Sequence, residues 1–266
     1  MAQEGYDATL WESEEALGAL RYCTQNLSSN YSLKIAWPHQ LQVIWSDFSG
    51  LEIGLQALRD TGRVQRLWTT EGLAIIESSH YSDEISRLLG DEGETFKRWV
   101  IENNCLSATD EELSAAVGKD TIAILLTSGL ITRGDNSVYR LSHPLLGATM
   151  GLLMYGRKQL TSFLRKKKHH ELDLHALRKV FADSCQSLQS TASSSSVGKK
   201  RSRAGASDTE SFTLPSSTSS KRPQQSSAIF CCKELGLSYH LLDLEGRGLV
   251  STVKKPDGTS LVRLRS

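Results

Sequence analysis

A pattern that recurs three times constrains the fold of this 266-residue chain more than any other feature. Each copy has an apolar helix end, a glycine, and two short strands around a tight turn. Glycine adopts the left-handed conformation in which many helices end, and Gly, Asn and Asp suit hairpin turns. The copies span residues 55–77, 124–141 and 241–265, and Gly62, Gly129 and Gly246 are expected to end their helices.

A helix that leads into a β-hairpin is the second half of a winged helix-turn-helix. We therefore predict a mainly α chain with small β-hairpins, an α+β fold of three tandem winged-helix (wHTH) domains. The predicted domains span residues 10–82, 83–155 and 156–266. A Ser-rich tract at about 186–227 interrupts the third domain, and its very low aliphatic content predicts a disordered insertion. Domains of this kind favour binding over catalysis.

Hydrophobic periodicity and capping residues predict the helices that precede each hairpin. In the second domain, Thr109 and Glu112 have the spacing of a capping box. Residues 144–155 are apolar nearly all round and are expected to form a buried linking helix. In the third domain, the first two helices are predicted at 157–168 and 172–181, and the third at 237–245.

The overall net charge of +1 conceals a strong polarity along the chain. Residues 1–155 carry 11 Lys or Arg against 21 Asp or Glu, whereas residues 156–266 carry 20 against 9. Such a chain is expected to meet a polyanion with its basic end, unless both ends are simply solvated surfaces. We expect no membrane contact, because the longest apolar run, 145–155, is too short to cross a bilayer. The five cysteines show no CxxC spacing, so no metal is expected either. Neither a cofactor nor a small-molecule substrate is expected.

Two groups of cations are candidate DNA-binding residues. The first lies on the predicted helix at 157–168, where offsets of seven and eight place several cations on one side, as a duplex backbone requires. It comprises Arg157, Lys158, Arg165, Lys166, Lys167 and Lys168. The alternative is a solvated helix end whose lysines complement the helix dipole. The second group lies at the third helix and its hairpin and comprises Arg247, Lys254, Lys255, Arg263 and Arg265.

The predicted third helices differ from what base reading requires. No Arg, Asn or Gln lies between Leu237 and Glu245. If this helix meets DNA, its residues therefore favour recognition of DNA shape and backbone over base readout. Tyr239 and His240 at its start are equally compatible with a DNA contact and with a packed core. The third helices of the first two domains, 49–61 and 120–128, are poor in cations. They favour protein docking or packing on neighbouring domains.

A short basic run in the Ser-rich tract fits a nuclear localisation signal. It comprises Lys199, Lys200, Arg201 and Arg203. Phosphorylation of flanking serines would mask these charges. We therefore expect the protein in the nucleus.

The second half of the chain resembles the family named serine/threonine-protein kinase 19. The resemblance is carried by residues 156–159, 164–168, 235–240 and 261–264, and 128–132 extend it into the second domain. It implies three winged helices, duplex DNA binding, chromatin association and a scaffold role in transcription-coupled nucleotide excision repair. Transcription and repair proteins are then the expected partners. The Ser-rich insertion departs from the family pattern.

The kinase in the family's name does not fit these residues. A protein kinase needs a glycine-rich loop, an HRD aspartate and a DFG aspartate. The chain contains neither GxGxxG nor HRD, and its nearest approach to DFG is Asp47-Phe48-Ser49. We therefore predict a non-enzymatic DNA-binding protein with no catalytic residues. The alternative is a winged-helix adaptor that binds proteins and not DNA, and a kinase is a distant third.

Overall fold

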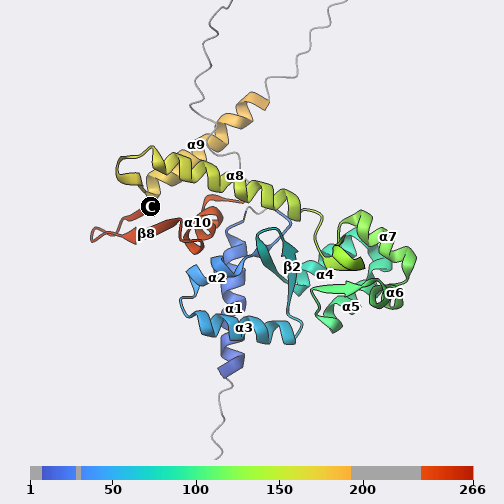
Figure 1. Ribbon diagram of the computed structural model, residues 1–266. Helices are drawn as coiled ribbons and strands as arrows, with labels where there is room; N and C mark the ends of the chain where they lie inside the picture. Colours follow the sequence, from blue (N-terminus) through green and yellow to red (C-terminus); the bar gives the residue numbers. More distant parts are fainter. Residues whose placement is uncertain (1–7, 28–30, 193–234, 266) are drawn as a thin grey trace, which may run out of the picture.

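The computed structural model describes residues 8–27, 31–192 and 235–265, which form three units with one repeated order of elements (Figure 1). In each unit a helix, a short strand, two helices and a hairpin follow one another. The first unit comprises α1 (Ala8–Gln25), β1 (Ile35–Ala36), α2 (Pro38–Ile44), α3 (Phe48–Asp60), β2 (Val64–Thr69) and β3 (Gly72–Glu77).

The second unit carries one additional helix at its start. It comprises α4 (Ser78–Leu89), the short 3-10 helix η1 (Gly90–Gly93), α5 (Glu94–Asn103), β4 (Ser107–Thr109), α6 (Asp110–Val117), α7 (Lys119–Ser128), β5 (Ile131–Arg133), η2 (Asp135–Ser137) and β6 (Val138–Leu141). The predicted capping box is present at α6, where the Thr109 hydroxyl accepts from Glu112 N–H and the Glu112 carboxylate accepts from Thr109 N–H.

The third unit comprises α8 (Leu146–Arg165), η3 (Lys168–His170), β7 (Glu171–Asp173), α9 (Leu174–Ala192), α10 (Leu237–Gly246), β8 (Val250–Lys254) and β9 (Ser260–Leu264). Its first helix differs from the prediction. One continuous helix, α8, replaces the separate segments expected at 144–155 and 157–168, because the residue between them, Gly156, is helical and packs against the His240 ring. Helix α9 continues to Ala192, so residues 186–192 are helical and the expected insertion starts too early. The remainder of that insertion lies outside the described residues.

Each unit contains a three-stranded antiparallel sheet, and all three sheets have the same topology. The short first strand pairs with the last strand of the hairpin, giving the orders β1-β3-β2, β4-β6-β5 and β7-β9-β8. All three predicted hairpins form, and the expected mainly helical α+β chain with small antiparallel sheets is confirmed. The short strands were not predicted, because two or three residues are too few to show an alternating pattern.

The helix before each hairpin ends in the same way. The residue after a left-handed glycine donates its N–H to a carbonyl five residues back: Arg63 to Leu58, Leu130 to Leu125, and Leu249 to Leu244. The left-handed glycines are Gly62 and Gly129, as predicted, but Gly248 in the third unit. Helix α10 does end at Gly246, as expected, but Gly246 is not the left-handed residue that was expected there. Gly246 is needed for another reason, because a Cβ there would lie 2.0 Å from the backbone oxygen of His39.

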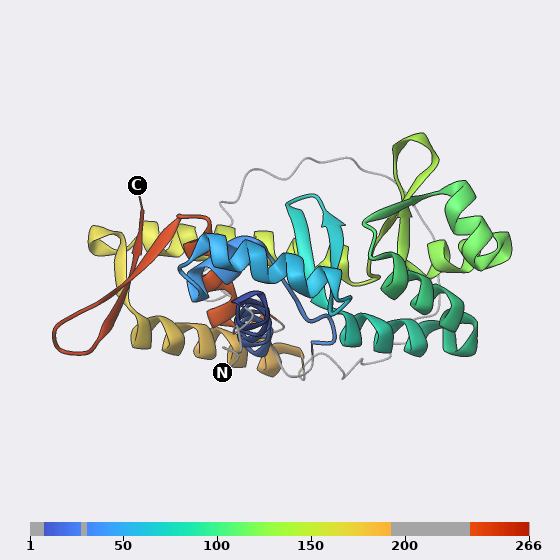
Figure 2. The same cartoon turned by 90° about the horizontal axis from the view of Figure 1, so that it is seen from below.

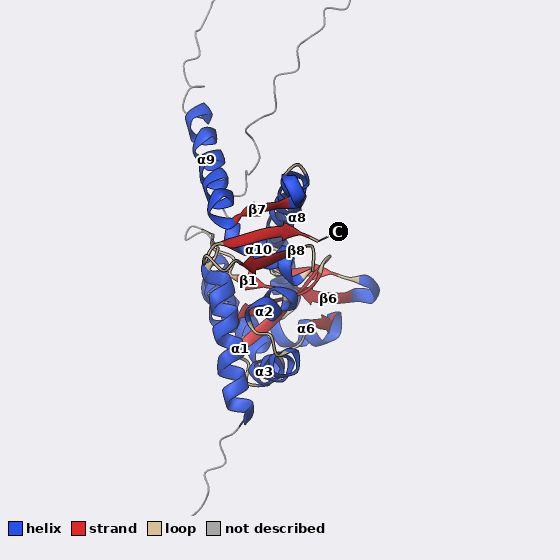
Figure 3. Ribbon diagram, turned by 90° about the vertical axis from the view of Figure 1, so that its left-hand side faces the viewer, coloured by secondary structure: helices blue, strands red, loops and turns tan. Residues whose placement is uncertain are grey.

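The three units lie roughly in a row, with the first in the middle (Figure 2). The expected boundaries at 82 and 155 fall within α4 and α8, so both junctions are continuous helix. Helix α8 extends from the second unit across the first to the third (Figure 1). Seen from the third unit, the β7–β9–β8 sheet faces the viewer, and α9 extends away from α1 (Figure 3).

A single apolar core joins the first two units, and a smaller one fills the third. Tyr81 of α4 is fully buried, with its hydroxyl 3.1 Å from the Leu130 oxygen and 3.0 Å from the Ser142 oxygen. Arg140 of the second unit stacks on Trp68 of the first, 5.1 Å from the ring centroid. The Arg140–Trp68 contact and the shared core fix the first two units against each other.

Replacement of Gly246 tests whether the third unit packs on the first as described. We expect Gly246→Ala to lower the free energy of unfolding by about 1–3 kcal/mol, because the added methyl meets the His39 backbone. The measurement is urea-induced unfolding. Gly151→Ala is the control, since Gly151 lies within α8 with no atom within 4 Å of the added Cβ. That variant should gain about 0.5–1 kcal/mol, and equal effects of the two would contradict the described packing.

Candidate nucleic-acid interface

The carboxyl-terminal end of α8 gathers the densest group of exposed cations in the third unit. Arg165 and Lys166 are exposed at the end of the helix, and Lys168 follows in η3. Lys167 is half-buried, with its Nζ 4.4 Å from the ring centroid of Phe163. The turn holds His169 and His170 at φ values of 57° and 56°, and His170 N–H donates to the Lys167 oxygen at 3.0 Å.

These positions differ from the prediction that the cations form a single stripe along one helix. Because α8 ends at Arg165, Lys166 to Lys168 lie on a turn that changes the direction of the chain. Lys158 and Arg165 do share a side of α8, and both are exposed. The structure thus brings Lys158 and Arg165 onto one helical face and presents Lys166 and Lys168 beyond its end.

The hairpin β8–β9 carries the second group of cations apart from Arg247 and protrudes from the same end of the molecule (Figures 1 and 2). Its tip is held by Asp257, whose carboxylate accepts from the N–H and the hydroxyl of Thr259 at 2.9 and 2.7 Å. Lys254 and Lys255 are exposed on the tip, and Arg265 is exposed near the chain end. Arg263 is exposed too, but its Nη2 forms an ion pair with Glu171 at 2.8 Å.

Two further cations on this unit were not among the sequence candidates. Arg178 and Lys179 are exposed on α9, directly after the buried Leu177. The sequence signal was available, since these cations flank an apolar position of an amphipathic helix. The predicted localisation residues, Lys199, Lys200, Arg201 and Arg203, lie outside the described residues.

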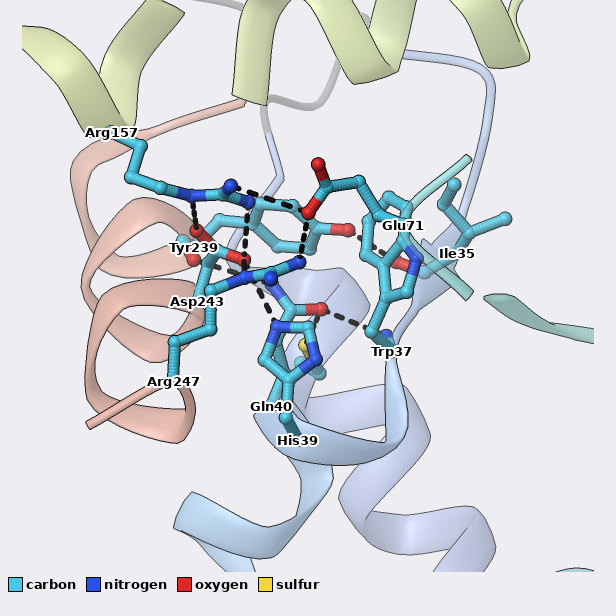
Figure 4. A network of polar contacts seen from close by, with 10 residues as sticks. Ile35, Trp37, His39, Gln40, Glu71, Arg157, Tyr239, Asp243 and Arg247 are labelled. Atoms are coloured by element: carbon cyan, nitrogen blue, oxygen red, sulfur yellow. Dashed lines mark hydrogen bonds and ion pairs between the residues drawn. The ribbon is translucent and has the colours of Figure 1, made fainter. Parts of the chain in front are cut away.

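Arg157, like the candidate Arg247, differs from the other candidates, because its guanidinium is part of a polar cluster between units (Figure 4). Its Nε lies 3.0 Å from Asp243 Oδ2, and its Nη1 lies 3.3 Å from Glu71 Oε2. Arg247 makes the matching pair of contacts, at 3.0 Å to Asp243 and 2.6 Å to Glu71. His39 Nε2 completes the set, 3.0 Å from Asp243 Oδ1. We name these five residues the Asp243 cluster.

The Asp243 cluster joins α8 and α10 of the third unit to α2 and the β2–β3 turn of the first. The Asp243 side chain is fully buried, which alone would raise its pKa. Hydrogen bonds from His39 and Arg157 outweigh that effect and lower the pKa to about 2. With only 17% of its side chain exposed, Arg157 holds the units together and is not available for phosphates.

Helix α10 is likewise unavailable to a DNA groove. None of its residues is exposed, because α2 and α8 cover it. Tyr239 donates its hydroxyl to the Ile35 oxygen at 2.7 Å, and the His240 ring packs against Gly156, where a Cβ would approach it to 2.2 Å. Burial lowers the pKa of His240 to about 4, so its imidazole is neutral near pH 7. Tyr239 and His240 are therefore core residues, which decides between the two alternatives that the sequence left open for them.

Two negative findings concern only the described residues. Within 8–27, 31–192 and 235–265, no three or more His, Cys, Asp or Glu side chains are grouped so that they could hold a metal ion. Across the same ranges, no helix has the length and apolarity to cross a membrane.

The variant Asp243→Asn tests the importance of the Asp243 cluster. We expect the free energy of unfolding at pH 7 to fall by about 3–5 kcal/mol, because two guanidinium groups lose a buried counter-charge. The wild-type pKa of about 2 lies below that of an unfolded aspartate, about 3.9. The stabilisation by this carboxylate is therefore fully present above about pH 4 and is lost as the pH falls towards 2.

Thermal unfolding between pH 7 and pH 2.5 measures both effects. The variant should be less stable at pH 7, and its difference from the wild type should shrink as the solution becomes acidic. Asp257→Asn, at the exposed hairpin tip, is the control and should change stability by less than about 0.5 kcal/mol. A difference between Asp243→Asn and wild type that stays constant with pH would contradict the assignment.

Comparison with known proteins agrees with the resemblance in the sequence. The chain matches the family described as inactive serine-threonine protein kinase 19 over residues 13–263, which is nearly its whole length. No curated protein matches the chain. The match includes α8, the Asp243 cluster and the β8–β9 hairpin, so it covers every described element that positions the cations. The chain belongs to the inactive serine-threonine protein kinase 19 family.

Proposed function

We propose that this protein is a non-enzymatic, double-stranded DNA-binding protein built from three tandem winged-helix domains. The order of helix, strand, two helices and hairpin, repeated three times, supports the winged-helix assignment. The family is one of inactive kinases, which is consistent with a role other than phosphoryl transfer. A kinase remains a distant third reading.

The observation that carries DNA binding is the concentration of exposed cations at one end of a chain that is acidic elsewhere. The end of α8 supplies Lys158, Arg165, Lys166 and Lys168, and the hairpin supplies Lys254 and Lys255. Lysine and arginine at such positions bind phosphates and release counterions, which gives affinity without base readout. The burial of α10 agrees with that mode, since the helix that would read bases is covered.

We further propose, from the family resemblance, that the protein acts in the nucleus as a scaffold in transcription-coupled nucleotide excision repair. Its third unit would hold the duplex, and its acidic first two units would meet transcription and repair proteins. The alternative is an adaptor without direct DNA binding. The exposed apolar side chains Phe48 and Ile53 on α3, and Ile124 and Leu126 on α7, favour protein contacts by those two units in either case.

Salt-dependent binding to a random duplex tests the proposal. We expect the affinity to fall steeply with salt, with the slope of log K against log salt changing by about 0.9 for each phosphate contact. The variant carrying Lys166→Glu, Lys168→Glu, Lys254→Glu and Lys255→Glu should lose most of the affinity and up to about 3.6 of the slope. Fluorescence anisotropy at several salt concentrations measures both quantities.

The control places two charge reversals of the same kind on the second unit. Lys119→Glu with Arg133→Glu should leave the duplex affinity nearly unchanged, since both residues are exposed away from the third unit. Glu111→Lys should leave it unchanged or raise it; Glu112 is spared because it caps α6. Absence of wild-type binding at low salt would refute direct DNA binding and favour the adaptor.

A further inference from the structure

The first unit contains a pocket between α3 and the β2–β3 hairpin that has both apolar and polar lining residues. Its volume is about 130 Å³. A buried cavity of about 150 Å³ can hold a benzene molecule, so this pocket has room for one aliphatic or aromatic side chain. The apolar lining comes from Pro38, Leu55, Val64, Leu73 and Ile75, and the polar lining from Glu52, Gln56, Arg59 and Arg66.

The two arginines beside this pocket are short of partners. The Nε of Arg59 is buried and makes no hydrogen bond, and its Nη1 makes only a long contact of 3.5 Å with Gln56. Within the described part of the chain, no carboxylate lies within 4.0 Å of the guanidinium of Arg59 or Arg66. Burial lowers the pKa of Arg66, and the charge of Arg59 lowers it further. A buried donor without a partner is costly, and a carboxylate would satisfy it.

We propose that this pocket is a docking site for a peptide segment of a partner protein. The peptide inserts one apolar side chain between α3 and the hairpin and presents an Asp or Glu carboxylate to Arg59 and Arg66. The inference does not depend on DNA binding, because the pocket lies in the first unit and uses none of the third-unit cations.

A peptide fits the surroundings of the pocket better than a nucleic acid does. Glu52 lines the pocket, and the charges of Glu52 and Asp60 both act on Arg66. A duplex would bring many phosphates towards these carboxylates, whereas a peptide can place a single carboxylate between the arginines. The apolar lining residues also offer nothing to a phosphate. On α3 itself, Phe48 and Ile53 are 55% and 46% exposed and extend the apolar surface available to a protein.

Peptide selection on the full-length protein tests the proposal. A library of random 12-residue peptides is selected against the protein, and enriched peptides are synthesised with a fluorophore for anisotropy titration. We expect the enriched peptides to share an apolar residue within a few positions of Asp or Glu. Arg66→Glu should weaken their binding at least tenfold, as should Leu73→Trp, which fills the pocket without changing charge. Arg98→Glu, an exposed cation on α5, is the control and should bind like the wild type.

One variant is expected to bind the peptides more strongly, an effect that misfolding cannot produce. Glu52→Gln removes a negative charge from the pocket and should strengthen the binding of acidic peptides several-fold. Random duplex DNA is titrated in parallel. If Arg66→Glu reduces duplex affinity and leaves peptide affinity unchanged, the pocket serves nucleic acid and the proposal is wrong. A change in the oligomeric mass of the protein with Arg66→Glu would assign the pocket to a second copy of this chain and would overturn the proposal. Selection that enriches no peptide of the stated pattern also overturns the proposal.

Discussion

The buried carboxylate of Asp243 is the contact on which the arrangement of the units depends. It accepts hydrogen bonds from His39 on α2, Arg157 on α8 and Arg247 on its own helix. Glu71 from the hairpin turn of the first unit compensates the second positive charge. A buried charge is tolerated only when it is paired and hydrogen-bonded. The cluster therefore requires all four elements to be in place together, and the positions of α8 and of the cations at its end follow from it.

Local sequence signals predicted the hairpins well and the packing between units poorly. Gly62 and Gly129 end their helices as expected, because the requirement for a left-handed residue is local. Gly246 and Arg157 were misread, because their reasons lie in contacts with His39 and Asp243, distant in sequence. One signal was overlooked. Asp243 interrupts the apolar run Leu241-Leu242-Asp243-Leu244, and a charge in such a run often marks a buried pair.

For the candidate nucleic-acid interface too, the local features were predicted and the packing between units was not. The exposed lysines of the hairpin and of the α8 end were predicted from composition and turn geometry, and the structure places them at one end of the molecule. The sequence could not show that α10 is covered, since the residues that cover it belong to the first unit and to α8. This burial agrees with the expectation that base readout is not the mode of recognition: cations on a helix end and a hairpin can follow a phosphate backbone, whereas a covered helix cannot probe base edges. The acidic first two units provide surfaces of a different chemical character on the same molecule.

The contact between Tyr239 and Ile35 joins residues 204 positions apart, and α10 fills a face of the first unit rather than of its own neighbours alone. During synthesis, α1 to α3 emerge long before the helix that completes them. The first unit therefore leaves Ile35, His39 and Gln40 uncovered until α10 has been synthesised. Contacts of such long range slow folding. Loss of α10 would therefore destabilise the first unit as well as the third.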